Sequence, residues 1–158
     1  MKRIESTNQF ENCEEHWKAS AAAKKYEPIK VILDSNALFV PLEFKIDIFA
    51  ETERLLNRRV DFVLLSSVKR ELELLSKRDA PKIRSQAAFA LRLAEKCKFV
   101  PVEEDENVTT DDAIVKVAKS WNCPVFTNDR LLRKRLKDIS VPVIYLRQKS
   151  RLDVNGLI

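Results

Sequence analysis

Five short apolar runs constrain the fold of this chain more than any other feature of its sequence. They are two to six residues long and occupy residues 31–33, 62–65, 99–100, 125–126 and 141–146. Two of the runs end abruptly at polar positions, the first at Asp34 and the fourth at Thr127. Continuous apolar runs of this length are typical of parallel strands that are covered on both faces. The sequence therefore predicts a sheet of five short, buried strands.

Helical patterns fill most of the stretches between these runs. In each pattern, apolar side chains recur every three or four residues, which places them on one face of a helix. The apolar faces are Ile46, Phe49, Leu55 and Leu56; Val68, Leu72 and Leu75; Ala87, Ala90, Leu91 and Ala94; Ile114, Val117, Ala118 and Trp121; and Leu131, Leu132 and Leu136. Trp121 is therefore expected in the core. The alternation predicts an α/β fold, a three-layer α/β/α sandwich around a mainly parallel five-stranded sheet.

A single folded domain is expected over residues 29–150. Residues 1–28 are polar and charge-balanced and are interpreted as an N-terminal extension, and residues 151–158 as a C-terminal tail. A chain of 158 residues, 45% of them hydrophobic, suits one domain with a substantial core. No apolar run approaches the roughly 20 residues of a membrane span, and the N-terminus lacks the apolar core of a signal peptide. We therefore expect a cytoplasmic protein without a membrane partner.

Composition narrows the chemistry that this chain can perform. Gly156 is its only glycine, so a glycine-rich phosphate loop is impossible. The single histidine, His16, argues against a His-rich zinc site and against a histidine-dependent catalytic triad. The three cysteines are scattered and odd in number, which predicts no disulfide framework. Carboxylates are the side chains that remain to carry chemistry.

Carboxylates stand where the predicted strands end, which is where α/β sheets bind ligands. Asp34 ends the first run and Asp129 follows the fourth. Asp111 opens the helix between the third and fourth runs, and Glu71 lies one turn into the helix after the second. Singly, each has an ordinary explanation as a strand end, a helix cap, a turn residue or a solvated helix position. Together they predict a site for a hard divalent cation such as Mg²⁺ or Mn²⁺, whose chemistry includes phosphodiester hydrolysis.

The segments that carry these acids resemble the PIN domain family in content and order. They are residues 31–36 (VILDSN), 70–73 (RELE), 110–115 (TDDAIV) and 127–130 (TNDR). Residues 141–147 resemble the final strand of the rRNA-processing branch of this family and its archaeal relatives, whereas VapC-type toxins are a more distant resemblance. The resemblance covers roughly residues 29–150. It implies a PIN-like fold and a metal-dependent ribonuclease.

The resemblance also implies a role for each matching side chain. It implies catalytic, metal-holding acids at Asp34, Glu71, Asp111 and Asp129 and supporting polar residues at Asn36 and Thr127. At the third position the family needs one acid where this chain has Asp111 and Asp112, so Asp112 stays a further metal-binding candidate. Asp111 is preferred because helical spacing puts it on the face of Ile114 that should meet the sheet. Glu73 is the alternative to Glu71 and falls on the more exposed side.

Basic side chains crowd the short helix that follows Asp129. Helical spacing puts four of them on one side as expected RNA contacts, namely Arg130, Arg133, Lys134 and Lys137. Cations beside a metal site would hold RNA phosphates in a salt-dependent way, although a solvated helix face explains any one of them equally well. The net charge of +5 agrees with an anionic partner.

The leading hypothesis is a metal-dependent endonuclease that cuts single-stranded or loop RNA, in rRNA processing or in RNA turnover. The alternatives are a catalytically weak PIN-fold scaffold that binds RNA in a ribonucleoprotein assembly, and a VapC-like toxin ribonuclease. A haloacid-dehalogenase-type phosphatase is disfavoured because Asn36 stands where that class has its second aspartate. A homodimer through the apolar stripe of residues 83–97 is a further hypothesis, but the sequence alone does not separate that stripe from core.

Overall fold

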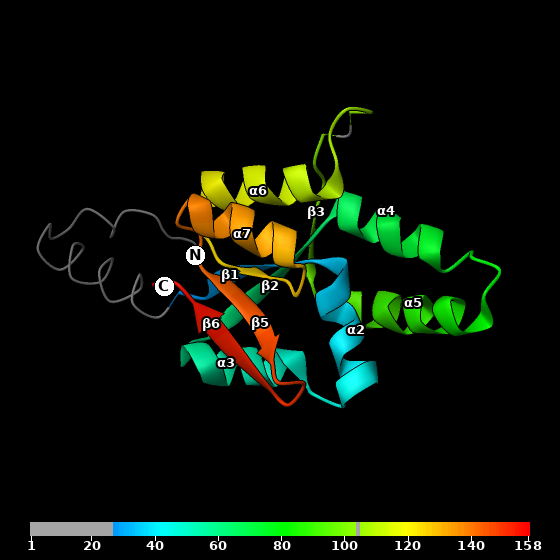
Figure 1. The fold of residues 1–158 in the computed structure, drawn as a ribbon, viewed down its shortest axis with the longest axis horizontal. Helices are drawn as coiled ribbons and strands as arrows, with labels where there is room; N and C mark the ends of the chain where they lie inside the picture. Colours follow the sequence, from blue (N-terminus) through cyan, green and yellow to red (C-terminus); the bar gives the residue numbers. More distant parts are fainter. Residues whose placement is uncertain (1–26, 104) are drawn as a thin grey trace, which may run out of the picture.

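The computed structural model describes residues 27–103 and 105–158 (Figure 1). The elements are, in chain order, β1 (Ile29–Leu33), α2 (Ser35–Phe44), α3 (Ile48–Leu56), β2 (Val60–Leu65), α4 (Ser66–Leu75), α5 (Pro81–Ala94), β3 (Lys98–Val100), α6 (Thr110–Trp121), β4 (Val125–Phe126), α7 (Arg130–Asp138), β5 (Val143–Arg147) and β6 (Arg151–Asn155). The predicted α/β class is confirmed.

The strands form one six-stranded sheet in the order β3-β2-β1-β4-β5-β6. Neighbouring strands from β3 to β5 pair in parallel, and β6 pairs with β5 in antiparallel register, Tyr145 opposite Asp153. The predicted count of five strands was wrong, because β6 lies in the segment that was expected to be a tail. From β1 the chain builds outward to β3, then returns to place β4 on the other side of β1. Sheets of this kind bind ligands at the carboxyl ends of the strands beside such a reversal.

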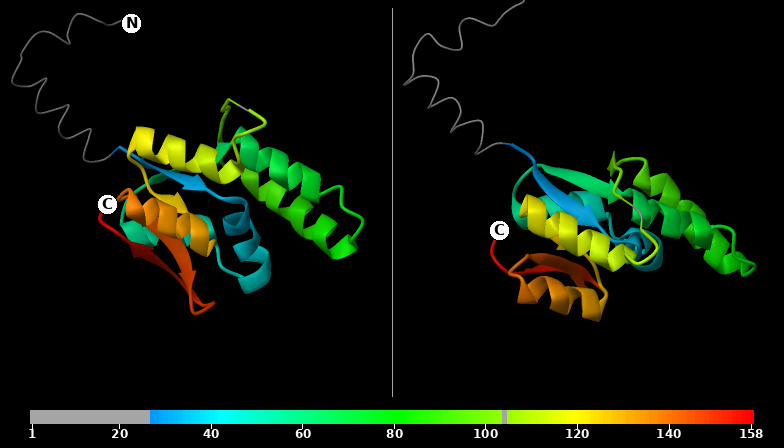
Figure 2. Two further views of the ribbon diagram at one scale, coloured as in Figure 1. Left: turned by 45° about the horizontal axis from the view of Figure 1, so that its top comes forward. Right: turned by 90° about the horizontal axis from the view of Figure 1, so that it is seen from above.

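Helices cover both faces of the sheet. Figure 1 shows α6 and α7 on one side of the strands and α3 on the other, where α3 contacts β2 and β6. The helices α4 and α5 pack against each other and extend beyond the sheet as a pair, as both views in Figure 2 show. This arrangement is the three-layer sandwich that the alternation of elements predicts. None of the helices in the described part of the chain has the length and apolar character to cross a membrane.

The core surrounds the central strands on both faces. Val31, Ile32 and Leu33 of β1 have no exposed surface, and Phe126 of β4 and Ile144 of β5 are equally buried. Burial of successive residues requires apolar side chains on both faces of the strand, which explains the continuous runs in the sequence. Each fully buried side chain of this size contributes about 1.5–3 kcal/mol to folding. The strand ends that carry the acids are thereby fixed in position.

Two expectations about helix faces are resolved by burial. Ala87, Ala90 and Ala94 are buried, so these positions of α5 belong to the core, whereas Ile83 of the same helix is 40% exposed. Trp121 was expected in the core, and this was wrong: the residue is 37% exposed, and the ammonium of Lys30 lies 4.6 Å from its ring centroid. The tryptophan stands at the last position of α6.

Candidate active site

Asp34 is the buried centre of the candidate site. It follows β1 directly and caps the N-terminus of α2, where its Oδ1 accepts a hydrogen bond from the Ser35 backbone N–H at 2.8 Å. Its Oδ2 accepts from the Thr127 hydroxyl at 2.7 Å and from the Asn36 side-chain amide at 3.2 Å. The carboxyl group is thus held by three donors while only 4% of the residue is exposed. Hydrogen bonds of this kind fix both its position and its orientation.

Thr127 connects the first half of the site to the second. It follows β4, the strand that pairs with β1, and its bond to Asp34 joins residues 93 positions apart. Its hydroxyl also accepts from the backbone N–H of Asp129 at 3.1 Å. Asp129 caps α7, with its Oδ1 accepting from the N–H groups of Leu131 and Leu132 at 2.8 and 3.2 Å. One buried hydroxyl therefore positions acids from both central strands.

Two asparagines tie the same loops together. The side-chain oxygen of Asn36 accepts from the backbone N–H of Asn128 at 3.0 Å. Asn128 in turn accepts from the backbone N–H of Leu146 in β5 at 2.7 Å through its side-chain oxygen. Asn36 and Thr127 thus lie beside Asp34, where the sequence expected supporting residues, and the network extends across three neighbouring strands. Asn128 was not assigned a role from the sequence.

Glu71 approaches Asp34 from the neighbouring helix α4. Its Oε1 accepts a hydrogen bond from the Ser35 hydroxyl at 2.5 Å, and Ser35 is the residue that immediately follows Asp34. Glu71 is half-buried, whereas the alternative acid Glu73 is exposed. Ser35 is a second functional contact that sequence reasoning did not assign. Its position directly after the strand-end acid was the available signal.

Asp111 and Asp112 point to different partners at the start of α6. Asp112 forms a reciprocal cap with Thr109, and its Oδ1 pairs with the Arg135 guanidinium of α7 at 2.9 Å. The hydrogen bonds from Thr109 and Arg135 lower the pKa of Asp112. Asp111 instead has its pKa raised, by partial burial and then by the negative charge of Asp129. Asp112 is therefore held by the helix cap and by Arg135. Asp111 is the one of the pair whose pKa is raised by the charges of Asp129 and Glu71.

Electrostatic coupling shows that the four acids share one region. The pKa of Asp34 is raised to about 6, chiefly by burial and in smaller part by the charges of Asp111 and Glu71, against the lowering effect of its bonds to Thr127 and Ser35. The charge of Glu71 also raises the pKa of Asp111. Like charges raise one another's pKa only when they are close in a poorly screened environment. Segments from β1, α4, α6 and α7 therefore bring their acids together at one edge of the sheet.

The donor chemistry of this region fits a hard divalent cation. Carboxylate oxygens are the preferred ligands of Mg²⁺. Burial, and after it the charges of Asp111 and Glu71, disfavours the charged form of Asp34 in the free protein, and a bound cation would stabilise that form. Within residues 27–103 and 105–158, no group of three or more His, Cys, Asp or Glu side chains forms a ready-made metal cluster. Mg²⁺ usually keeps several waters and binds through one or two carboxylates, so such a cluster is not required. The assignment of individual ligands stays a prediction.

The basic helix α7 begins at the site. Arg130, Lys134 and Lys137 are exposed, as contacts with RNA would require. Arg133 is half-buried, with its guanidinium carbon 3.9 Å from the ring centroid of Tyr145 in β5. The four side chains expected from helical spacing to form one basic face therefore divide into three solvated cations and one that stacks on the sheet.

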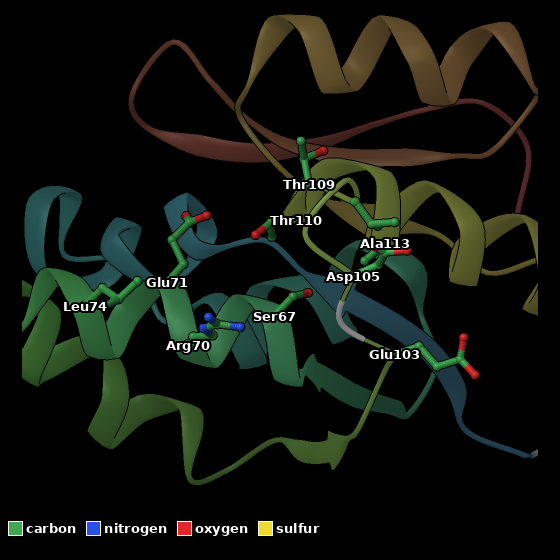
Figure 3. A pocket seen from close by; sticks show the side chains of 10 residues that line it. Ser67, Arg70, Glu71, Leu74, Glu103, Asp105, Thr109, Thr110 and Ala113 are labelled. Atoms are coloured by element: carbon green, nitrogen blue, oxygen red, sulfur yellow. The ribbon is translucent and has the colours of Figure 1, made fainter.

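A cavity of about 270 Å³ opens beside Glu71. Figure 3 shows it between α4, which contributes Ser67, Arg70 and Leu74 besides Glu71, and the segment leading into α6. Because Glu71 belongs to both the cavity and the acid region, the two are adjacent. The sequence did not indicate this cavity. Its walls come from two segments that are far apart in the sequence, and the pattern of apolar residues within each segment does not show that they face each other.

Known proteins are similar to this chain in sequence and in fold. A family profile described as "PIN like domain" matches residues 31–149. Ribonuclease VapC4 of Methanocaldococcus jannaschii is 35% identical over 130 residues, which cover 82% of this chain and 98% of that protein. Ribonuclease VapC9 of Archaeoglobus fulgidus is 31% identical over 126 residues, covering 80% and 89%.

A solved structure, titled "Structure of the PIN domain endonuclease Utp24", superposes with a TM-score of 0.69 at 27% identity, covering 83% of this chain and 94% of that one. The matched residues 31–149 include the four acids and nearly all the elements that position them. From the family match and the identity to the two ribonucleases, the chain belongs to the PIN domain family.

Proposed function

We propose that this chain is a metal-dependent RNA endonuclease that hydrolyses phosphodiester bonds of single-stranded RNA with Mg²⁺ or Mn²⁺. The observation that carries the proposal is the convergence of Asp34, Glu71, Asp111 and Asp129 at the carboxyl ends of β1 and β4. A fold gains nothing in stability from acids that raise one another's pKa. Their gathering is explained by a function that needs negative charge at one place.

The four acids would hold the cation, and the surrounding residues would orient them. When bound, a divalent cation stabilises negative charge on the phosphodiester and lowers the pKa of attacking water. Thr127 and Asn36 hold the Oδ2 atom of Asp34 in a fixed direction. Ser35 does the same for Oε1 of Glu71. Hydrolysis adds water across one P–O bond, so the RNA chain is divided into two pieces without a covalent enzyme intermediate.

The exposed cations of α7 would hold the RNA strand at the site. Asp129 caps this helix, so Arg130 is its first residue and Lys134 lies one turn further along the same side. Phosphate contacts by such side chains give affinity that does not depend on base sequence and that falls with salt. They would place the scissile phosphate near the acids whatever the base sequence of the RNA.

The relatives support RNA as the substrate. Both curated relatives are named ribonucleases, and the solved structure is named an endonuclease. Ribosomal precursor RNA and the targets of VapC-type ribonucleases are the two classes of substrate to compare. A cytoplasmic location is also part of the proposal.

The test is cleavage of a fluorescently labelled single-stranded RNA with Mn²⁺ by the wild type and by Asp34→Asn. Asp47→Asn is the matched control, because Asp47 also caps a helix, α3, but lies outside the site. We expect cleavage by the wild type and the control and none by Asp34→Asn or in EDTA. Equal cleavage by both Asp34 forms would refute the proposed site. RNA binding in EDTA with no cleavage under either metal would instead favour the scaffold.

A further inference from the structure

The cavity beside Glu71 has two chemically different kinds of wall. Leu74 of α4 and Val108 of the segment before α6 are apolar yet 60% and 42% exposed, and Ala113 adds a buried apolar surface. Ser67 and Thr110 contribute hydroxyl groups. The apolar side chains offer contact surface and the hydroxyl groups offer hydrogen bonds, and a small organic group can use both.

Ser67 supplies the second observation. Its Oγ is inaccessible to solvent and has no hydrogen-bond partner among the described residues. The neighbouring Ser66, by contrast, has its Oγ accept from the backbone N–H of Val102 at 2.9 Å. Buried hydroxyls are nearly always paired. Ser67 lines the cavity, unlike Thr52, which is equally unpaired among the described residues, so rotation of its side chain toward the cavity would give the Ser67 hydroxyl a ligand as partner. A hydroxyl can donate to that ligand or accept from it.

The charges of the lining indicate which part of an RNA strand would enter. Three carboxylates border the cavity, those of Glu71, Glu103 and Asp105, against the single cation of Arg70. Such a lining repels a phosphate group. A nucleobase is uncharged, has flat apolar faces for the walls and has polar edges for the hydroxyl of Ser67. The volume of about 270 Å³ is smaller than that of most drug-sized sites and suits one ring system rather than several.

We propose that this cavity is a subsite that binds a single nucleobase of the RNA strand next to the cleaved phosphodiester. The inference rests on the proposed function. RNA is taken as the ligand because Glu71 belongs both to the acids of the proposed nuclease site and to the lining of the cavity. Ser67 would pair with a polar edge of the base, and Leu74 and Val108 would contact its faces. The base preference of cleavage would then come from α4 and the segment before α6, while α7 holds phosphates without preference.

The test measures binding separately from cleavage. A labelled single-stranded RNA is titrated with protein in EDTA, followed by fluorescence anisotropy, with one nucleotide at a time replaced by an abasic one. For the wild type we expect one position at which loss of the base weakens binding by about 10-fold or more, because the base loses its hydrogen bond and its apolar contacts together. Ser67→Ala should weaken binding of the intact RNA by about 2- to 10-fold, the effect of one hydrogen bond, and reduce the loss at that position.

Two further variants distinguish a loss of RNA binding at the cavity from a general loss of folding. Thr52→Val removes the other buried hydroxyl without a partner in the described residues, in α3 away from the cavity. Neither it nor Ser67→Ala breaks a hydrogen bond of the free protein, so both should fold, and Thr52→Val should bind RNA like the wild type. Leu74→Ala removes an exposed apolar side chain from the cavity lining and should weaken RNA binding as Ser67→Ala does.

Equal binding of all abasic RNAs by the wild type, or equal affinity of Ser67→Ala and Thr52→Val, would overturn the subsite. These results are separate from the cleavage assay. Cleavage that requires Asp34 but shows no dependence on Ser67 or on any one base would remove the subsite and leave the nuclease intact. A base-dependent affinity that is lost in Ser67→Ala, in a protein that never cleaves, would support the subsite and remove the nuclease.

Discussion

Replacing Asp34 by asparagine should abolish catalysis and yet stabilise the metal-free protein at neutral pH. The folded state raises the pKa of Asp34 from its ordinary value of 3.8 to about 6, chiefly by burial. At about 1.4 kcal/mol per pH unit, the folded protein therefore holds this charge at a cost of about 3 kcal/mol. Asparagine removes the charge but keeps the shape.

Part of that gain is offset by lost hydrogen bonding. The Thr127 hydroxyl donates to Oδ2 of Asp34 at 2.7 Å, and an amide nitrogen at that position cannot accept it. A bond to a charged acceptor contributes about 1.5–3 kcal/mol, and the neutral amide recovers part of it by donating instead. The net expectation for Asp34→Asn at pH 7.5 in EDTA is an increase of about 1–2 kcal/mol in the free energy of unfolding.

The pH dependence identifies the cause. Because the folded pKa is raised, the folded protein keeps a proton on Asp34 that the unfolded chain has already released between pH 3.8 and about 6. The stability contributed by this group is present below that window and is lost as the pH rises through it. Asparagine does not titrate, so the advantage of the variant should be absent at pH 4 and complete by about pH 7.

Adding Mn²⁺ should reverse the order. An ion at 100 times its dissociation constant stabilises the folded state by about 2.7 kcal/mol, and only the wild type should gain this. The assay is urea denaturation followed by circular dichroism, at pH 4 and 7.5, with EDTA or Mn²⁺, and with Asp47→Asn as the control. A variant that is less stable than the wild type by the same amount at both pH values in EDTA would refute the reasoning.

Three further predictions concern the acids, the hydroxyl between them and the basic helix. Asp111→Asn should abolish cleavage. Asp112→Asn should keep cleavage and lower the melting temperature modestly, because Asp112 caps α6 and pairs with Arg135. The reverse result in a cleavage assay would make Asp112 the metal ligand. Thr127→Val should lower the free energy of unfolding by about 2–3 kcal/mol in urea denaturation, and a change below 0.5 kcal/mol would show that its buried bonds contribute little. Arg130→Ala with Lys134→Ala should weaken binding of single-stranded RNA in EDTA and reduce the slope of log affinity against log salt by about 1.4, and an unchanged slope would remove α7 from the RNA contacts.

The sequence predicted the sheet well because its strands are buried on both faces. A strand in that environment must be continuously apolar, and it ends where polar residues begin, as at Asp34. The helix α2 was missed for the same reason. Ala37, Leu38 and Val40 are all buried, so apolar residues follow one another with few polar ones between them to mark a helical period, and Pro41 interrupts the pattern.

The strand β6 was missed for the opposite reason. Its sequence alternates polar and apolar residues in a segment of only five residues, and such a segment is a strand only because β5 is beside it to pair with. The acids of the site were predictable, since strand ends in a parallel sheet meet at one edge. The contacts of Ser35 and Asn128 were not, because they depend on the directions that side chains take after the strands end.

The bond between Asp34 and Thr127 has a consequence for the life of the protein in a cell. The two residues come from opposite halves of the chain, so a ribosome must complete nearly the whole domain before the acids meet. A growing or truncated polypeptide that stops before β4 has Asp34 and Glu71 but neither Thr127 nor Asp129 to finish the site. The proposed ribonuclease activity thus arises only when synthesis of the domain is nearly complete, which limits the exposure of ribosomal RNA to an active site on the growing chain.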